Sequence, residues 1–111
     1  METIFSKIIR REIPADIVLE DDDVLAFRDI NPVAPTHVLV IPKKPIVNVG
    51  SLDEGDQALV GRCMLACQEV AQAEGLTDFR VITNSGAGAG QSVFHLHFHV
   101  IGGRSLTWPP G

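Results

Sequence analysis

Three of the four histidines lie two residues apart near the end of the sequence, at His95, His97 and His99. In a β-strand, successive side chains point to opposite faces, so this spacing places all three imidazoles on one face. The residues beside them are apolar and are predicted to face the core: Phe94, Leu96, Phe98 and Val100. Because three imidazoles on one face replace residues that pack well, we expect them to bind a metal or to act in acid-base and nucleophilic catalysis.

One interpretation is a zinc site, in which His95 and His97 bind the ion together with His37. The three triad histidines fit one tetrahedral ion poorly, since same-face neighbours on a strand lie ~6.6 Å apart and the ends ~13 Å apart. His99 is then left without a role, and no carboxylate adjoins the triad to orient the ligands. We therefore expect a metal-independent site, with zinc as the alternative.

The other interpretation is phosphate chemistry with a histidine nucleophile. Residues 84–92 read Asn-Ser-Gly-Ala-Gly-Ala-Gly-Gln-Ser, a loop of small residues whose backbone N–H groups can turn toward an anion. The loop matches neither the P-loop nor the dinucleotide-binding pattern, so its position directly before the triad is what makes it informative. Imidazole, with an unperturbed pKa of ~6.5, is mostly neutral near pH 7 and can attack phosphorus. A carbonyl bonded to one of its nitrogens would leave the other nitrogen free to attack.

Residues 95–100, His-Leu-His-Phe-His-Val, resemble the His-x-His-x-His signature of the histidine triad (HIT) superfamily. Further segments are similar to its histidine triad nucleotide-binding (Hint) branch: residues 3–9, 26–32, 34–37, 90–93, 102–104 and 108–111. Dinucleoside polyphosphate hydrolases share the triad, but the Gly-Gly-Arg at residues 102–104 and the final Trp-Pro-Pro-Gly favour the phosphoramidase branch. The resemblance extends over residues 3–111.

This resemblance implies an enzyme that hydrolyses adenosine or guanosine 5′-monophosphoramidates to AMP or GMP and an amine. It implies that His97 is the nucleophile, which attacks the α-phosphorus and forms a nucleotidyl-histidine intermediate. His99 and Ser92 would hydrogen-bond phosphate oxygens or the leaving group, while His37 and His95 would support the nucleophile. The resemblance implies that no cofactor is needed. The alternative is a purine nucleotide-binding regulatory protein without catalytic activity.

The resemblance assigns nucleotide binding to a second set of residues. Asp29 matches the carboxylate that binds the ribose hydroxyls, but next to a proline-bearing loop it can also be a turn residue. Asn84 matches a residue near the phosphate and 5′-oxygen, and backbone N–H groups of Gly90, Gln91 and Ser92 are expected to bind phosphate. The apolar purine pocket is expected from Phe5, Ile8, Ile13, Phe27 and Ile30. For the first three of these, simple core packing is the alternative.

The hydrophobic pattern predicts the elements that must hold these residues. We expect a short helix over residues 4–11, ended by Pro14, and a long helix over residues 51–75 that starts with a capping box of Ser51 and Glu54. The predicted strands cover residues 17–20, 24–28, 37–41, 79–83 and 93–101. Strands around one main helix favour an α+β fold with a five-stranded antiparallel sheet. The family resemblance also implies a homodimer in which two such sheets join into one.

Composition places these elements in a single domain, residues 1–111. The chain has 111 residues, of which 45% are hydrophobic and 21% charged, enough for one ordinary core. The net charge of −5 argues against nucleic-acid binding. No apolar run approaches the ~20 residues that span a bilayer. Cys63 and Cys67 are one helical turn apart, where a disulfide would be strained, so we expect buried thiols and a cytoplasmic protein.

Overall fold

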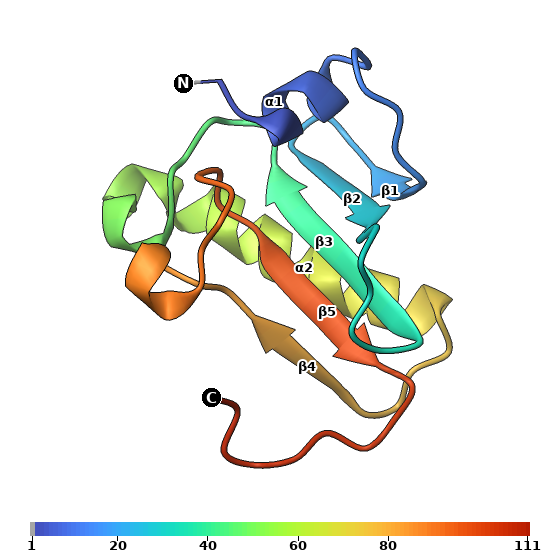
Figure 1. The fold of residues 1–111 in the computed structure, drawn as a ribbon. Coiled ribbons are helices and arrows are strands. Elements are labelled where there is room, and N and C mark those ends of the chain that lie inside the picture. The colour runs from blue at the N-terminus through green and yellow to red at the C-terminus, as the bar shows by residue number, and fades with distance from the viewer. Residues whose placement is uncertain (1) are drawn as a thin grey trace.

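A five-stranded antiparallel sheet forms the centre of the computed structural model, which describes residues 2–111 (Figure 1). The strands are β1 (Ile17–Glu20), β2 (Val24–Arg28), β3 (Thr36–Pro42), β4 (Phe79–Ile82) and β5 (Phe98–Gly102). Their order is β1-β2-β3-β5-β4, and each neighbouring pair is antiparallel. Helices α1 (Ile4–Ile9) and α2 (Gln57–Ala73) complete the predicted α+β fold. Within residues 2–111, no helix is long and apolar enough to cross a membrane.

The two helices lie on opposite faces of the sheet, as the alternation along β2 shows. Val24 and Ala26 are fully buried in the cluster that packs against α2. Leu25 and Phe27 point the other way, into a second cluster that contains Phe5 of α1. In Figure 1, α2 runs behind the sheet, and α1 lies at one end of it near β2 and β3. Successive residues of one strand therefore contribute to two separate cores.

Helix α1 is shorter than predicted. Its N-terminus is capped by Thr3, whose Oγ1 accepts the backbone N–H groups of Phe5 and Ser6 at 3.1 and 3.4 Å. The helix ends at Ile9 because the chain turns at Arg11, whose φ of 63° lies in the left-handed region. The prediction that Pro14 ends this helix was therefore wrong, since the helix stops before the proline is reached.

Helix α2 begins at Gln57, so the predicted start at Ser51 was wrong. Two 3₁₀ turns, η1 and η2, precede it at Val49–Ser51 and Glu54–Asp56. The observed capping box joins Asp53 and Asp56, and an Asp56 carboxylate oxygen accepts the Asp53 N–H at 3.1 Å. The chain therefore makes two tight turns over the residues for which we predicted the first turns of one long helix.

Strand β5 begins at Phe98, whereas the predicted strand starts at residue 93. A bend over residues 93–95 interrupts the extended chain before it joins the sheet. This bend leaves Phe94 40% exposed, so the prediction that it faces the core was wrong. Of the triad, only His99 lies within the strand.

Two other strand boundaries differ from the prediction and affect the triad. Strand β3 is one residue longer at each end, and Pro42 lies within it, where its carbonyl accepts a hydrogen bond from the His95 ring at 2.7 Å. Strand β4 ends before Thr83, whose hydroxyl donates to the carbonyl oxygen of His97 at 2.8 Å. Strand β3 and the residue that follows β4 therefore both bind the segment that carries the histidines.

The two cysteines are free thiols in the core beneath α2, as predicted. Burial raises the pKa of Cys63 to about 11 and that of Cys67 to about 12. Both side chains therefore remain protonated near neutral pH and pack as small apolar residues.

Candidate active site

A cavity of ≈ 350 Å³ opens on the α1 side of the sheet beside the triad. Its apolar lining comes mainly from α1, the segment after it, β2 and β3: Phe5, Ile8, Ile13, Phe27 and Leu39. The polar side chains that line it include Asp29, Ser92, His97 and His99. Ile30, also predicted for the pocket, borders the cavity but is 90% exposed. An apolar pocket with a few converging polar groups is the usual form of a small-molecule site.

The ring of His97 has one nitrogen fixed and one nitrogen available. Its Nδ1 lies 2.7 Å from the carbonyl oxygen of His95, and because a carbonyl only accepts, the proton must be on Nδ1. Nε2 therefore keeps its lone pair. The ring of Phe5 packs edge-on against the imidazole, with centroids 5.1 Å apart. Burial lowers the pKa of His97, opposed in part by the His95 carbonyl, so the ring stays neutral and nucleophilic at pH 7.

His99 and His37 form a hydrogen-bonded pair whose direction can be assigned. The backbone N–H of Val33 donates to Nδ1 of His37 at 3.1 Å, so the His37 proton is on Nε2. Nε2 lies 2.8 Å from Nδ1 of His99 and donates to it. His99 must then carry its own proton on Nε2, the ring nitrogen that His37 does not contact. Burial and the nearby His97 and His37 rings lower the pKa of His99 to about 4.

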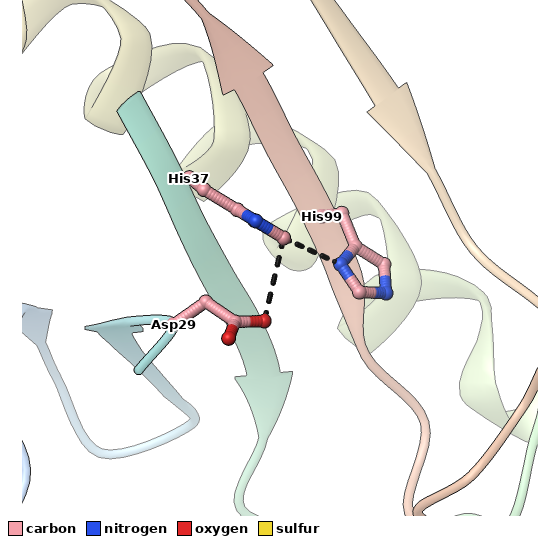
Figure 2. Close-up of side chains that lie close together, drawn as sticks. All are labelled: Asp29, His37 and His99. Carbon is pink, nitrogen blue, oxygen red and sulfur yellow. Dashed lines mark hydrogen bonds and ion pairs between the residues drawn. The ribbon is translucent and has the colours of Figure 1, made fainter. Parts of the chain in front are cut away.

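Asp29 faces both the cavity and the histidine pair. Figure 2 shows His37 between Asp29 and His99, with one Asp29 oxygen 3.4 Å from Nε2 of His37. The other carboxylate oxygen accepts the backbone N–H of Asn31 at 2.8 Å and forms a turn. The two interpretations of Asp29 are therefore compatible, because one carboxylate makes the turn and also lines the pocket.

His95 lies behind His97, outside the lining of this cavity. Its side chain is 2% exposed, and its Nε2 donates to the carbonyl oxygen of Pro42 at 2.7 Å. Burial lowers the pKa of its ring. His95 therefore acts on His97 through its main-chain carbonyl, while its ring fixes that carbonyl to β3.

The structure does not bring together the zinc ligands considered from the sequence, His37, His95 and His97. Within residues 2–111, the group of possible metal ligands that comes close is Asp29, His37 and His99, whose ligand atoms lie within 4.8 Å of one another. A neutral imidazole has one lone pair, and His37 uses it to accept the Val33 N–H. Its Nε2 carries a proton and has no lone pair for an ion, so this cluster fits hydrogen bonding better than metal binding.

The glycine-rich loop departs from the predicted phosphate cradle. The N–H of Gly90 donates to Ala87 O at 3.0 Å and that of Gln91 to Gly86 O at 3.1 Å, so neither is free for an anion. The buried Gln91 amide bonds four groups: Val47 O, Val93 O, Asn48 Nδ2 and the Gly86 N–H. Gln91 therefore shapes the loop. Ser92, which is exposed, is the loop residue that reaches the cavity, and Asn84 does not line it.

Sequence reasoning missed three contributors to the site, one through its backbone and two through their side chains. The Val33 N–H fixes the His37 tautomer, yet an exposed valine gives no sequence signal for this contact. Leu39 was missed as a pocket residue, although its place in the alternating pattern of β3 could have indicated it. The Thr83 hydroxyl was also missed, and a polar residue just past a strand is too common to single out.

Comparisons with known proteins found a matching family model, similar sequences and similar solved structures. A family model described as the HIT domain matches residues 10–106. An uncharacterized HIT-like protein of Synechococcus elongatus is 58% identical over 111 residues, which cover 99% of this chain and 97% of that protein. The crystal structure of a HIT family hydrolase from Legionella pneumophila is 46% identical, with a TM-score of 0.96 and coverage of 99% and 100% of the two chains. A histidine triad protein from Clostridium difficile is 43% identical, with a TM-score of 0.91 and coverage of 96% and 95%.

Proposed function

The chain belongs to the HIT domain family, and we propose that it hydrolyses the P–N bond of purine nucleoside 5′-monophosphoramidates. Two similar solved proteins are named HIT family hydrolases, which supports hydrolysis in general. The observation that carries the proposal is the His97 ring, which lines the cavity with Nδ1 bonded to a carbonyl and Nε2 unprotonated. The narrower assignment to phosphoramidates rests on the resemblance to the Hint branch in residues 102–104 and 108–111.

In the first step, the Nε2 lone pair of His97 attacks the α-phosphorus and forms a new P–N bond. The bond from phosphorus to the amine breaks, and its electron pair stays with the amine nitrogen. That nitrogen takes up one proton from solvent, which is delivered through the Ser92 hydroxyl or the His99 Nε2–H. Such general-acid catalysis typically increases the rate by ~10²–10⁴-fold. The His97 ring becomes positively charged, and its Nδ1–H bond to the His95 carbonyl stabilises that charge.

In the second step, a water oxygen attacks the same phosphorus. The bond from phosphorus to His97 Nε2 breaks, its electron pair returns to the ring, and one water proton leaves to solvent. The products are a nucleoside monophosphate and a neutral His97 ready for the next cycle. Because no step uses a Lewis acid, we propose that the reaction is independent of metal ions.

The cavity supports binding of the nucleoside part of the substrate. Phe27 and Leu39 offer apolar surface to the purine, and Asp29 offers a carboxylate to the ribose hydroxyls. The predominantly apolar lining provides little hydrogen bonding to the edge of the base, so we propose that adenosine and guanosine substrates are both accepted.

We propose that the enzyme is a cytoplasmic homodimer, with strand β4 at the subunit contact. Within residues 2–111, β4 pairs only with β5, so its other edge is free to pair with a second copy. Apolar side chains lie exposed on β4 and α2: Phe79, Met64 and Leu65, which are 39%, 45% and 62% exposed. A second subunit would cover them.

The experiment that tests the proposed function measures turnover of an adenosine 5′-phosphoramidate with a fluorescent amine, in buffer containing EDTA. We expect turnover by the wild-type protein and none by His97→Ala, with AMP binding by calorimetry similar in both. Tight AMP binding without turnover by the wild type would instead indicate a nucleotide-binding regulatory protein. Activity that EDTA removes and zinc restores would overturn the metal-independent mechanism.

A further inference from the structure

Arg104, which follows strand β5, holds the loop that contacts His37. Its Nε and Nη2 atoms donate to the carbonyl oxygen of Val33 at 3.1 and 2.9 Å. Its third nitrogen, Nη1, donates to Ser105 O at 2.9 Å, which orients the guanidinium within its own segment. Two bonds that converge from one rigid guanidinium on one carbonyl oxygen fix its position better than a single bond does.

A second contact joins the same two segments. Gly103 has a φ of 93°, and a side-chain carbon at this position would lie 2.9 Å from Cβ of Pro35. The backbone of residue 103 therefore packs directly against the loop. The positive φ and this close approach both favour glycine, so the arginine is delivered to Val33 by a closely fitted turn.

Val33 is held on both of its backbone groups. Arg104 binds its carbonyl oxygen, while its N–H donates to Nδ1 of His37. Its side chain is 56% exposed, so burial does little to hold it in place. The loop prolines, Pro32 and Pro35, have no N–H and cannot replace Val33 as the donor to His37. Arg104 and His37 therefore hold the two peptide groups on either side of the Val33 Cα, and the position of the Val33 N–H depends on both contacts.

The Val33 N–H at Nδ1 of His37 and the Asp29 carboxylate oxygen 3.4 Å from its Nε2 together favour the tautomer that determines where His99 carries its proton. With the N–H in place, His37 donates from Nε2 and His99 accepts at Nδ1, so His99 has its proton on Nε2. Without it, His37 can carry its proton on Nδ1 and accept from His99. The His99 proton would then be on Nδ1, and its Nε2 would no longer donate to a bound substrate.

We propose that Arg104 is a positioning residue that sets the tautomer of His99 through Val33 and His37. The consequence for catalysis rests on the proposed function, because it requires a substrate that receives the His99 hydrogen bond. The tautomer itself does not depend on any substrate and can be measured in the free protein.

The test compares Arg104→Gln with Arg80→Gln, a matched control. Arg80 also binds a carbonyl of the C-terminal segment, Thr107 O at 2.8 Å, and this bond involves neither Val33 nor His37. Imidazole ¹⁵N NMR separates protonated from unprotonated ring nitrogens. We expect His99 to be protonated on Nε2 in the wild type and in Arg80→Gln, and to be a mixture of tautomers in Arg104→Gln. Arg104→Lys, which keeps one donor, should restore most of the wild-type spectrum.

Kinetics provide the second readout. For alkylamine substrates, kcat of Arg104→Gln should fall about tenfold, less than the ~10²–10⁴-fold value of a complete proton donor, with KM nearly unchanged. An unchanged His99 tautomer in Arg104→Gln, or equal losses in Arg80→Gln, would overturn the proposal. If the wild type does not cleave phosphoramidates, the proposed function fails, but the NMR result still decides whether Arg104 sets the tautomer.

Discussion

His97 donates its Nδ1–H to the carbonyl oxygen of His95, 2.7 Å away, so one triad residue fixes the tautomer of the next. The ring of His95 is itself bonded to Pro42 O on strand β3. The His97 ring is thus oriented by a chain of contacts that begins in the sheet and passes through a backbone carbonyl. Such an arrangement holds the reactive nitrogen before substrate arrives, which lowers the reorganisation needed for reaction.

Replacing His99 by alanine should lower the rate without abolishing it. The variant loses a hydrogen-bond donor near the leaving group, while the His97 nucleophile and its carbonyl partner remain. We expect kcat to fall by ~10²–10⁴-fold for an alkylamine leaving group. Substrates whose amine is weakly basic need less protonation and serve as the control, so their loss should be smaller. Equal losses for both leaving groups would contradict this role.

The pH dependence of kcat/KM should reflect the buried nucleophile. His97 attacks only when neutral, and burial lowers its pKa below the usual 6.5. The rate should therefore stay constant as the pH falls through 6.5 and decline only at lower pH. A profile measured from pH 4.5 to 8 tests this, provided that the folded state is verified at each point. A decline centred above pH 6.5 would contradict it.

Stability should also depend on pH through the triad. The folded-state pKa values of His95, His97 and His99 are lowered, that of His99 to about 4, so below pH 6.5 the unfolded chain binds more protons than the folded one. The contribution of these histidines to the free energy of unfolding is complete above pH 6.5 and is lost as the pH falls toward 4. Urea unfolding at pH 7.5, 6.0 and 5.0 measures the trend. Between pH 7.5 and 5.0, His99→Gln should lose less of its free energy of unfolding than the wild type. An identical loss would contradict the lowered pKa of His99.

Measuring the oligomeric state tests the proposal that a second subunit binds at the free edge of β4. Light scattering should give about 24 kDa, twice the 12.0 kDa of one chain. Leu65→Glu places a charge on the exposed apolar patch of α2 and should shift the protein toward the monomer. Ile17→Glu, on strand β1 at the opposite edge of the sheet, is the matched control and should leave the dimer intact. A wild-type monomer at micromolar concentration would contradict the proposed assembly.

Periodicity and residue chemistry predicted the sheet, both helices and the histidine segment. The boundaries were harder to predict, because several local patterns compete. Ser51 with Glu54 and Asp53 with Asp56 are both capping patterns, and only the packed structure selects the second. Helix α1 ends at Ile9, and the chain then turns at Arg11 with a positive φ, which is uncommon for any residue except glycine and has no sequence signal here.

The lining of the cavity was predictable where a side chain reaches it. His97, His99, Ser92 and Asp29, which we expected at the site, all line the cavity, and their catalytic and binding roles stay predictions. Gly90 and Gln91 do not provide free backbone donors, because their N–H groups close hydrogen bonds within the loop. Backbone partners depend on dihedral angles that a sequence of small residues leaves undetermined. The same limit explains why the sequence did not reveal the Val33 contact.

The most direct test of the account is a rapid-quench search for the covalent intermediate. Wild-type protein is mixed with an adenosine phosphoramidate labelled at the α-phosphorus, quenched within milliseconds, and digested for mass spectrometry. We predict a labelled nucleotide on His97, and no labelled adduct in the His97→Ala variant, which should retain AMP binding because the nucleoside contacts are unchanged. A labelled adduct on His97→Ala protein, or near-normal turnover by that variant, would contradict the assignment of His97 as the nucleophile.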